Sequence, residues 1–98
     1  MKKNIAAGVV LLTSSLAFAA APQLFTQCRA CHGTKAEKPA LGTSKVINTM
    51  NSFEIEKALK GYRAGTYGGA KKSIMKVQAS KLNDTQIGEL SAYIPTLR

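Results

Sequence analysis

One pentapeptide, Cys28-Arg29-Ala30-Cys31-His32, limits what this chain can fold around more than any other feature. Two thiols three residues apart lie on one helical turn, at the spacing that lets both add to the vinyl groups on one edge of a porphyrin. His32 is then held over one face of the ring and can offer an imidazole nitrogen to iron. The chain has no other cysteine or histidine. The pentapeptide therefore predicts one covalently attached haem c, with Cys28 and Cys31 as the attachment points.

Three other interpretations of the pentapeptide account for less. A redox-active pair of cysteines at this spacing belongs to a βαβ fold, and this short chain has no strand-rich pattern. A structural zinc site takes four Cys or His ligands, whereas the sequence holds only three such side chains. A simple disulfide leaves His32 as an ordinary surface residue. Haem attachment is the interpretation that uses all three side chains.

Residues 1–19 have the pattern of a secretory signal peptide. Lys2 and Lys3 give a charged start, a mostly apolar stretch follows, and Ala17-Phe18-Ala19 supplies a small-x-small cleavage site. A retained membrane anchor is the competing interpretation, but hydroxyl residues interrupt the apolar run, which is also short for a spanning helix. The c-type haem is attached outside the bacterial cytoplasm, so this segment and the haem motif support one another. We expect a cleaved signal peptide followed by a single exported, periplasmic, soluble domain over residues 20–98.

The charge of the expected mature domain restricts its partners. Of the 14 Lys and Arg side chains, two lie in the signal segment, which leaves 12 basic side chains against five acidic ones. A basic balance fits nucleic acid, anionic lipid or an acidic protein. Export and the low aromatic content, 6% of the chain, argue against nucleic acid. The domain is also small, so a covalently held porphyrin would be the largest apolar body in its core.

The mature part of the chain has the helix start and stop signals of a small all-α protein. Two capping boxes, Asn51 with Glu54 and Asn83 with Gln86, each mark the start of a helix, and Pro95 ends the last one. The predicted helices cover residues 22–31, 51–65, 71–78 and 83–94. A loop with one short turn is expected over residues 34–50, and a turn-rich link over residues 65–69.

The sixth iron position can be argued by elimination, because His32 has no second histidine beside it. Met50 and Met75 are the only methionines after the signal segment, and a thioether is a soft, neutral ligand that raises the potential of haem iron. Met75 lies far enough from His32 for the chain to wrap around the haem, and it precedes the final helix. Met50 fits a core position equally well. Met75 is the predicted ligand, with Met50, a lysine, a water or an open position as the remaining alternatives.

Several motifs together resemble class I cytochromes c, and most of all the small periplasmic cytochrome c-553 group of bacteria. The resemblance runs from about Leu24 to Leu97 and implies an all-α class I cytochrome c fold, with about four helices wrapped around one covalently attached haem. It also matches Met75 to the axial methionine of that family. The motifs are Cys28–Gly33, the segment Lys60–Gly69 with its Gly-Tyr and Gly-Gly pairs, Ile74-Met75, and Leu82-Asn83-Asp84.

The resemblance leaves three residues with two roles each. Pro39 matches the proline whose carbonyl accepts the Nδ1 hydrogen of the axial histidine, but the residues before it depart from the family's Gly-Pro pattern, and Pro39 can equally rigidify a loop. Tyr62 and Tyr67 can bond a haem propionate through their hydroxyls or can simply cover a small core.

Basic residues concentrate beside the expected iron ligands. Within six residues of His32 or Met75 lie seven basic side chains and a single acid, Glu37. A basic collar of this kind suits transient docking to an acidic patch on a redox protein, where charge mainly speeds encounter. The seven are Arg29, Lys35, Lys38, Lys71, Lys72, Lys76 and Lys81.

These features predict a monohaem, His/Met-ligated, one-electron carrier of the respiratory chain, monomeric and without enzymatic activity or a small-molecule substrate. Its partners are expected among oxidases, peroxidases, dehydrogenases or quinol–cytochrome c reductases. Two alternatives remain: a haem subunit of a larger redox complex, and a haem enzyme or gas sensor with an open sixth iron position. The second lacks a distal histidine for acid–base work.

Overall fold

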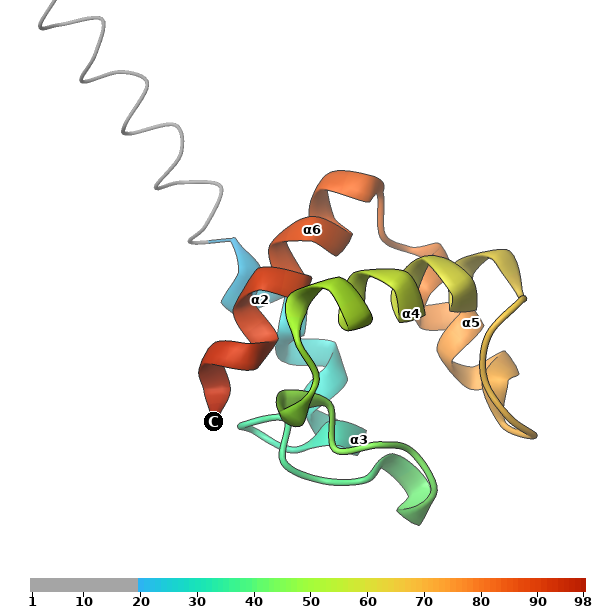
Figure 1. The fold of residues 1–98 in the computed structure, drawn as a ribbon, viewed down its shortest axis with the longest axis horizontal. Coiled ribbons are helices and arrows are strands. Elements are labelled where there is room, and N and C mark those ends of the chain that lie inside the picture. The colour runs from blue at the N-terminus through green and yellow to red at the C-terminus, as the bar shows by residue number, and fades with distance from the viewer. Residues whose placement is uncertain (1–19) are drawn as a thin grey trace, which may run out of the picture.

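The computed structural model describes residues 20–98, and within them all regular structure is helical, as expected. The expected signal peptide, residues 1–19, lies outside the described residues. Figure 1 shows the path of the chain. The helices are α2 (Ala21–Phe25), α3 (Arg29–His32), α4 (Ser52–Ala64), α5 (Lys72–Ser80) and α6 (Asp84–Tyr93).

The N-terminal helical segment is not one regular helix. A 3₁₀ turn, Thr26–Cys28, separates α2 from α3, where the sequence predicted a single helix. The Thr26 hydroxyl donates to the Pro22 carbonyl at 3.3 Å, and this back-bonding bends helices by competing for the carbonyl of the preceding turn. The segment ends at Gly33, whose φ of +89° lies outside the reach of most side chains. The haem motif therefore occupies the last turns of this segment.

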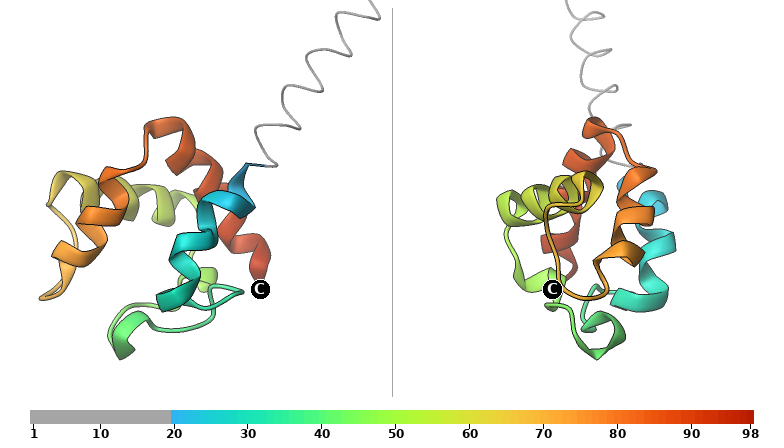
Figure 2. Two further views of the ribbon diagram at one scale, coloured as in Figure 1. Left: turned by 180° about the vertical axis from the view of Figure 1, so that it is seen from behind. Right: turned by 90° about the vertical axis from the view of Figure 1, so that its right-hand side faces the viewer.

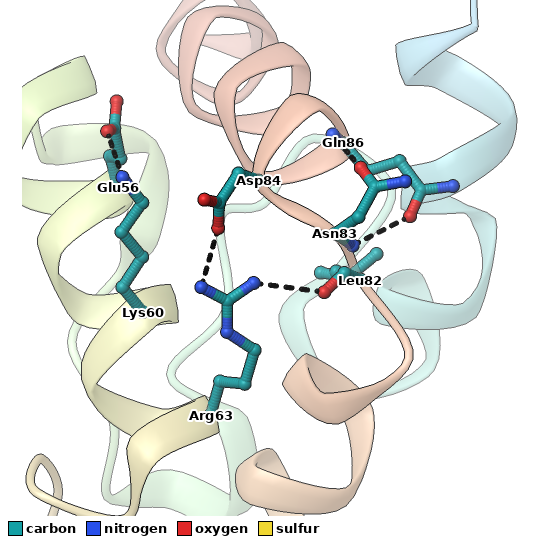
Figure 3. Close-up of polar contacts among 7 residues, drawn as sticks. All are labelled: Glu56, Lys60, Arg63, Leu82, Asn83, Asp84 and Gln86. Carbon is teal, nitrogen blue, oxygen red and sulfur yellow. Dashed lines mark hydrogen bonds and ion pairs between the residues drawn. The ribbon is translucent and has the colours of Figure 1, made fainter.

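Both predicted capping boxes are present. The backbone N–H of Glu54 donates to Asn51 Oδ1 at 2.8 Å, and the Asn51 N–H donates to Glu54 Oε1 at 2.9 Å. The same exchange joins Asn83 and Gln86 at 2.8 and 3.0 Å (Figure 3). Each box satisfies two backbone donors that the helix itself cannot. The starts of α4 and α6 are thus fixed locally, as the sequence predicted.

The segment between α3 and α4 has more structure than expected. It contains two 3₁₀ turns, Ala40–Gly42 and Ile47–Thr49, rather than one short turn. A further 3₁₀ turn, Ile94–Leu97, continues the chain beyond α6. Pro95 has no N–H for an α-helical hydrogen bond, so the α-helix stops before it and the chain continues as the tighter 3₁₀ turn.

The core lies where α2 crosses α6. Ile87, Leu90 and Ile94, which form one apolar stripe at the C-terminal end of the chain, are 0%, 1% and 3% exposed. Phe25 on α2 meets Tyr93 edge to face, with ring centroids 6.1 Å apart, an arrangement that aromatic pairs prefer. Figure 2 shows α4 and α5 packed together beside this crossing. The fold therefore has a compact N- and C-terminal crossing from which the α4–α5 pair extends.

Arg63 ties the end of α4 to the start of α6 (Figure 3). One guanidinium nitrogen pairs with Asp84 Oδ1 at 2.6 Å, and the other donates to the Leu82 carbonyl at 3.2 Å. The guanidinium lowers the pKa of the Asp84 carboxyl, mainly through this hydrogen bond. A second ion pair, Glu56 with Lys60, lies along the exposed face of α4. Arg63 therefore holds the turn between α5 and α6 against α4.

Candidate haem site

The four predicted site residues line one cavity of about 450 Å³. Cys28, Cys31 and His32 reach it from the N-terminal segment, and Met75 reaches it from α5. The volume lies within the range of small-molecule and cofactor pockets. The fold thus brings together residues that are well separated in sequence.

A smaller cavity of about 40 Å³ is lined by both His32 and Met75. Met50 does not line it; that side chain is 8% exposed and belongs to the hydrophobic core cluster, although it also lines the larger cavity. The position of Met50 matches its interpretation as core filler, and the position of Met75 supports its interpretation as the sixth ligand. The assignment of Met75 as the iron ligand stays a prediction.

His32 is a buried imidazole, 6% exposed. Burial lowers its pKa, which favours the neutral ring that can bind a metal. Its Nδ1 atom is buried without a hydrogen-bond partner among the described residues. A buried polar atom without a partner costs free energy.

The Pro39 carbonyl does not accept a hydrogen from His32. It accepts the N–H of Gly42 at 3.0 Å and so closes the turn Ala40–Gly42. Of the two roles that the sequence left open for Pro39, the structure contains the loop-stiffening one. Within residues 20–98, the hydrogen bond that the family forms between the proline carbonyl and the axial histidine is not present.

Both cysteines are free thiols, Cys28 half-buried and Cys31 exposed. Burial raises the pKa of the Cys28 thiol, and the neighbouring Cys31 raises it further. The two thiols, three residues apart, both line the cavity and are not joined to each other. They are therefore available to form bonds to a group bound in the cavity.

An apolar part of the cavity wall comes from α4, through Ile55, Ala58 and Leu59. The three residues belong to the helix that the sequence predicts over residues 51–65, and their spacing, i, i+3 and i+4, is that of a single helix face. Such a face suits a flat apolar ring better than a polar substrate.

Tyr62 and Tyr67 also line the cavity, with ring centroids 5.0 Å apart and the rings nearly perpendicular. Each tyrosine packs closely against a glycine. A Cβ on Gly61 would lie 2.6 Å from the Tyr67 Cβ, and a Cβ on Gly68 would lie 2.5 Å from the Tyr62 ring. The turn-rich link therefore lies tightly against α4, and burial raises the pKa of the Tyr62 hydroxyl.

Three lysines, Lys45, Lys71 and Lys72, line the cavity. Only the last two belong to the predicted collar, and the other five basic residues of that set do not line the cavity. Lys76 lies over Gly65, with its ammonium 3.3 Å from the place of a Cβ there, where the carboxyl end of α4 favours a cation. Lys45 was missed because it comes from the loop before α4, outside both sequence windows.

The residues present fit a covalently held haem. The cavity has an adequate volume, an apolar wall, two free thiols at its edge, and a buried imidazole. It also offers a thioether from Met75 near that imidazole. The donor set is that of His/Met-ligated haem iron.

Comparisons with known proteins agree with this fit. The family described as cytochrome c matches residues 18–98. The protein named cytochrome c-553 of Helicobacter pylori (strain ATCC 700392 / 26695) is 46% identical over 99 residues, covering 100% of both chains. Cytochrome c-553 of Nitratidesulfovibrio vulgaris (strain DSM 19637 / Miyazaki F) is 30% identical over 94 residues, covering 96% of this chain and 92% of that protein.

Proposed function

This chain belongs to the cytochrome c family, and we propose that it is a soluble periplasmic carrier that moves single electrons between respiratory proteins. Family membership establishes a monohaem electron carrier with covalent haem c, and not an enzyme. The proposal adds the location, the iron ligands and the kind of partner.

The observation that carries the ligand assignment is the small cavity lined by both His32 and Met75. We propose that Cys28 and Cys31 hold the haem through thioether bonds, and that His32 and Met75 are its axial ligands. Haem bound in this way supplies a one-electron change at iron. The buried surroundings and the neutral thioether of Met75 would favour the reduced form and raise the potential.

The partner proposal rests on charge around the cavity. Lys45, Lys71 and Lys72 line it from two separate segments, so an approaching protein meets positive charge beside the haem. An acidic patch on the partner would be attracted over several ångströms before contact. Such steering favours fast, short-lived encounters of the kind a carrier needs between its donor and its acceptor. Oxidases, peroxidases, dehydrogenases and quinol–cytochrome c reductases are the partner classes that fit.

The periplasmic location rests on the sequence pattern of residues 1–19 and on the requirement for haem attachment outside the cytoplasm. Among residues 20–98, no helix is both long and apolar enough to cross a membrane.

The absorption spectrum of the purified oxidised holoprotein tests the ligand pair. Sulfur-to-iron ligation gives a weak far-red band, and we expect that band together with a reversible one-electron wave in voltammetry. A spectrum without the band, combined with binding of carbon monoxide to the reduced protein, would favour the open-site alternative. Peptide mapping of the periplasmic fraction would test export and cleavage near Ala20.

Kinetics with respiratory membranes separate a free carrier from a bound subunit. We expect the second-order rate of electron transfer to fall as ionic strength rises, because the screening length shrinks to about 8 Å at 0.15 M salt. A rate indifferent to salt, together with copurification in a stable complex, would favour the subunit alternative.

A further inference from the structure

The loop that follows His32 closes on itself through its backbone. The N–H of Lys38 donates to the His32 carbonyl at 2.9 Å, and the N–H of Ala36 donates to the Gly33 carbonyl at 3.0 Å. Inside the loop the Glu37 carboxylate accepts the Lys35 N–H at 3.0 Å. The backbone of His32 is therefore one end of a small closed ring.

Asn48 is the one side chain outside this loop, within residues 20–98, that forms a hydrogen bond to it. Its Nδ2 donates to the Lys35 carbonyl at 2.9 Å, and its backbone N–H donates to the Ala36 carbonyl at 3.2 Å. Asn48 is itself buried, 8% exposed, so its side-chain and backbone amides are held in place to make these two bonds.

The backbone conformation of Ala36 explains why the loop needs these two hydrogen bonds from Asn48, which we call the Asn48 clamp. It is fully buried and has a φ of +57°, in the left-handed region that favours glycine. A non-glycine residue persists there only where its surroundings hold it. The two carbonyls that Asn48 binds belong to Ala36 and to the residue before it. Asn48 thus holds the strained residue from both sides.

The clamp also reaches the wall of the haem cavity. Asn48 lies in the turn Ile47–Thr49, and Ile47 lines both cavities. The His32 ring has no hydrogen bond at Nδ1 among the described residues, so its orientation depends on the backbone that carries it. We propose that Asn48 is a positioning residue for His32: it fixes the loop behind the imidazole to the cavity wall. This inference rests on the proposed role of His32 as an iron ligand.

Replacing Asn48 with leucine in the holoprotein tests the clamp. In Asn48→Leu, hydrogen exchange at the Lys38 amide should quicken about tenfold, the equivalent of about 1.4 kcal/mol, because the closed ring opens more often. The reduction potential should fall, because water then approaches the His32 side of the haem. The far-red sulfur band should remain, because Met75 is held by a different element.

Thr49→Val is the matched control. Thr49 lies in the same turn and donates its hydroxyl to the Val46 carbonyl at 2.6 Å, but it makes no side-chain bond to the loop after His32. This variant should leave both the potential and the Lys38 exchange rate close to wild type. Equal changes in Asn48→Leu and Thr49→Val would mean that the turn only supports the fold, and would overturn the proposal.

Asn48→Asp keeps the experiment decisive if the leucine variant does not mature. A neutral carboxyl can donate to the Lys35 carbonyl and an ionised one cannot, so the difference in potential from wild type should shrink as the carboxyl is protonated. A difference that does not depend on pH contradicts the clamp. The spectrum of the wild-type protein separates the ligand assignment from the role of Asn48. A wild-type spectrum without low-spin His ligation refutes the assignment of His32 as a ligand. Low-spin His ligation in the wild type, together with Asn48 variants that behave like the wild type, refutes only the role of Asn48.

Discussion

His32, at the end of α3, and Met75, in the middle of α5, line the same 40 Å³ cavity. They reach it from the two parts of the fold: α3 continues from the crossing of α2 with α6, whereas α5 packs on α4. An iron atom bound by both side chains would join these parts. The ligand pair is therefore expected to contribute to stability as well as to redox chemistry.

Met75→Leu should remove the far-red sulfur band, lower the reduction potential and admit carbon monoxide to the reduced iron, because the soft thioether is lost and its position is open. Absorption spectra and voltammetry measure all three changes. Met50→Leu is the control, since Met50 is packed in the core. This variant should keep the far-red band, and its free energy of unfolding should fall by less than about 1.5 kcal/mol. The opposite pattern in the two variants would assign the ligand to Met50.

Cys28→Ala combined with Cys31→Ala should abolish covalent attachment, because no other thiol exists in the chain. Haem should then extract freely into acidified organic solvent, whereas it should stay with the wild-type polypeptide. Denaturing electrophoresis with haem staining gives the same comparison. Free extraction from the wild-type protein would refute the thioether assignment.

Patterns within a few residues predicted most of the local structure. The capping box of Asn51 and Glu54, the second box before α6, and the apolar stripe ending at Ile94 all follow from short-range rules, and all are present. The 3₁₀ turn Thr26–Cys28 was not predicted, because it depends on one side-chain hydrogen bond, from the Thr26 hydroxyl to a carbonyl of the preceding turn.

The long-range features of the site were harder to predict. Asn48 donates to a carbonyl 13 positions away, in a loop without periodicity, and no local rule signals that pairing. Lys45, far from both expected ligands in sequence, lines the cavity, whereas Lys76, next to Met75 in sequence, lies over Gly65 instead. Distance along the chain is thus a poor guide to distance from the haem.

Gly61 in α4 and Gly88 in α6 should respond oppositely to alanine. A Cβ on Gly88 meets nothing within 4 Å, so Gly88→Ala should raise the free energy of unfolding by about 0.5–1 kcal/mol through helix propensity. A Cβ on Gly61 would lie 2.6 Å from the Tyr67 Cβ. Overpacking there costs about 1–3 kcal/mol, so Gly61→Ala should be destabilising overall.

Denaturant unfolding of the two holoproteins checks this pair. A gain in stability for both variants would mean that Tyr67 yields easily and that its packing on Gly61 does not matter. Because Tyr67 lines the cavity, the visible spectrum of Gly61→Ala should also change, while that of Gly88→Ala should not.

The ion pair of Arg63 and Asp84 should stabilise the fold in a pH-dependent way. The pKa of Asp84 is lowered in the folded state, so its contribution is complete above the unfolded pKa of about 3.9 and is lost as pH falls through the lower folded pKa. Asp84→Asn should therefore be less stable than wild type at pH 7 and should approach it in strong acid. Urea titrations across that range measure the difference, and a gap independent of pH would contradict the ion pair.

The carrier role can be tested through the three lysines that line the cavity. Reversing two of them in Lys45→Glu with Lys71→Glu should lower the second-order rate with a redox partner by tenfold or more, because positive charge beside the haem is replaced by negative charge. The spectrum should stay the same. Lys57→Glu with Arg98→Glu is the control: it changes the net charge equally, and neither residue lines the cavity. Its rate should fall less, and the difference between the two variants should vanish at high salt, where all these charges are screened. Equal losses at low salt would mean that net charge alone sets the rate and that no face of the protein is selected for docking.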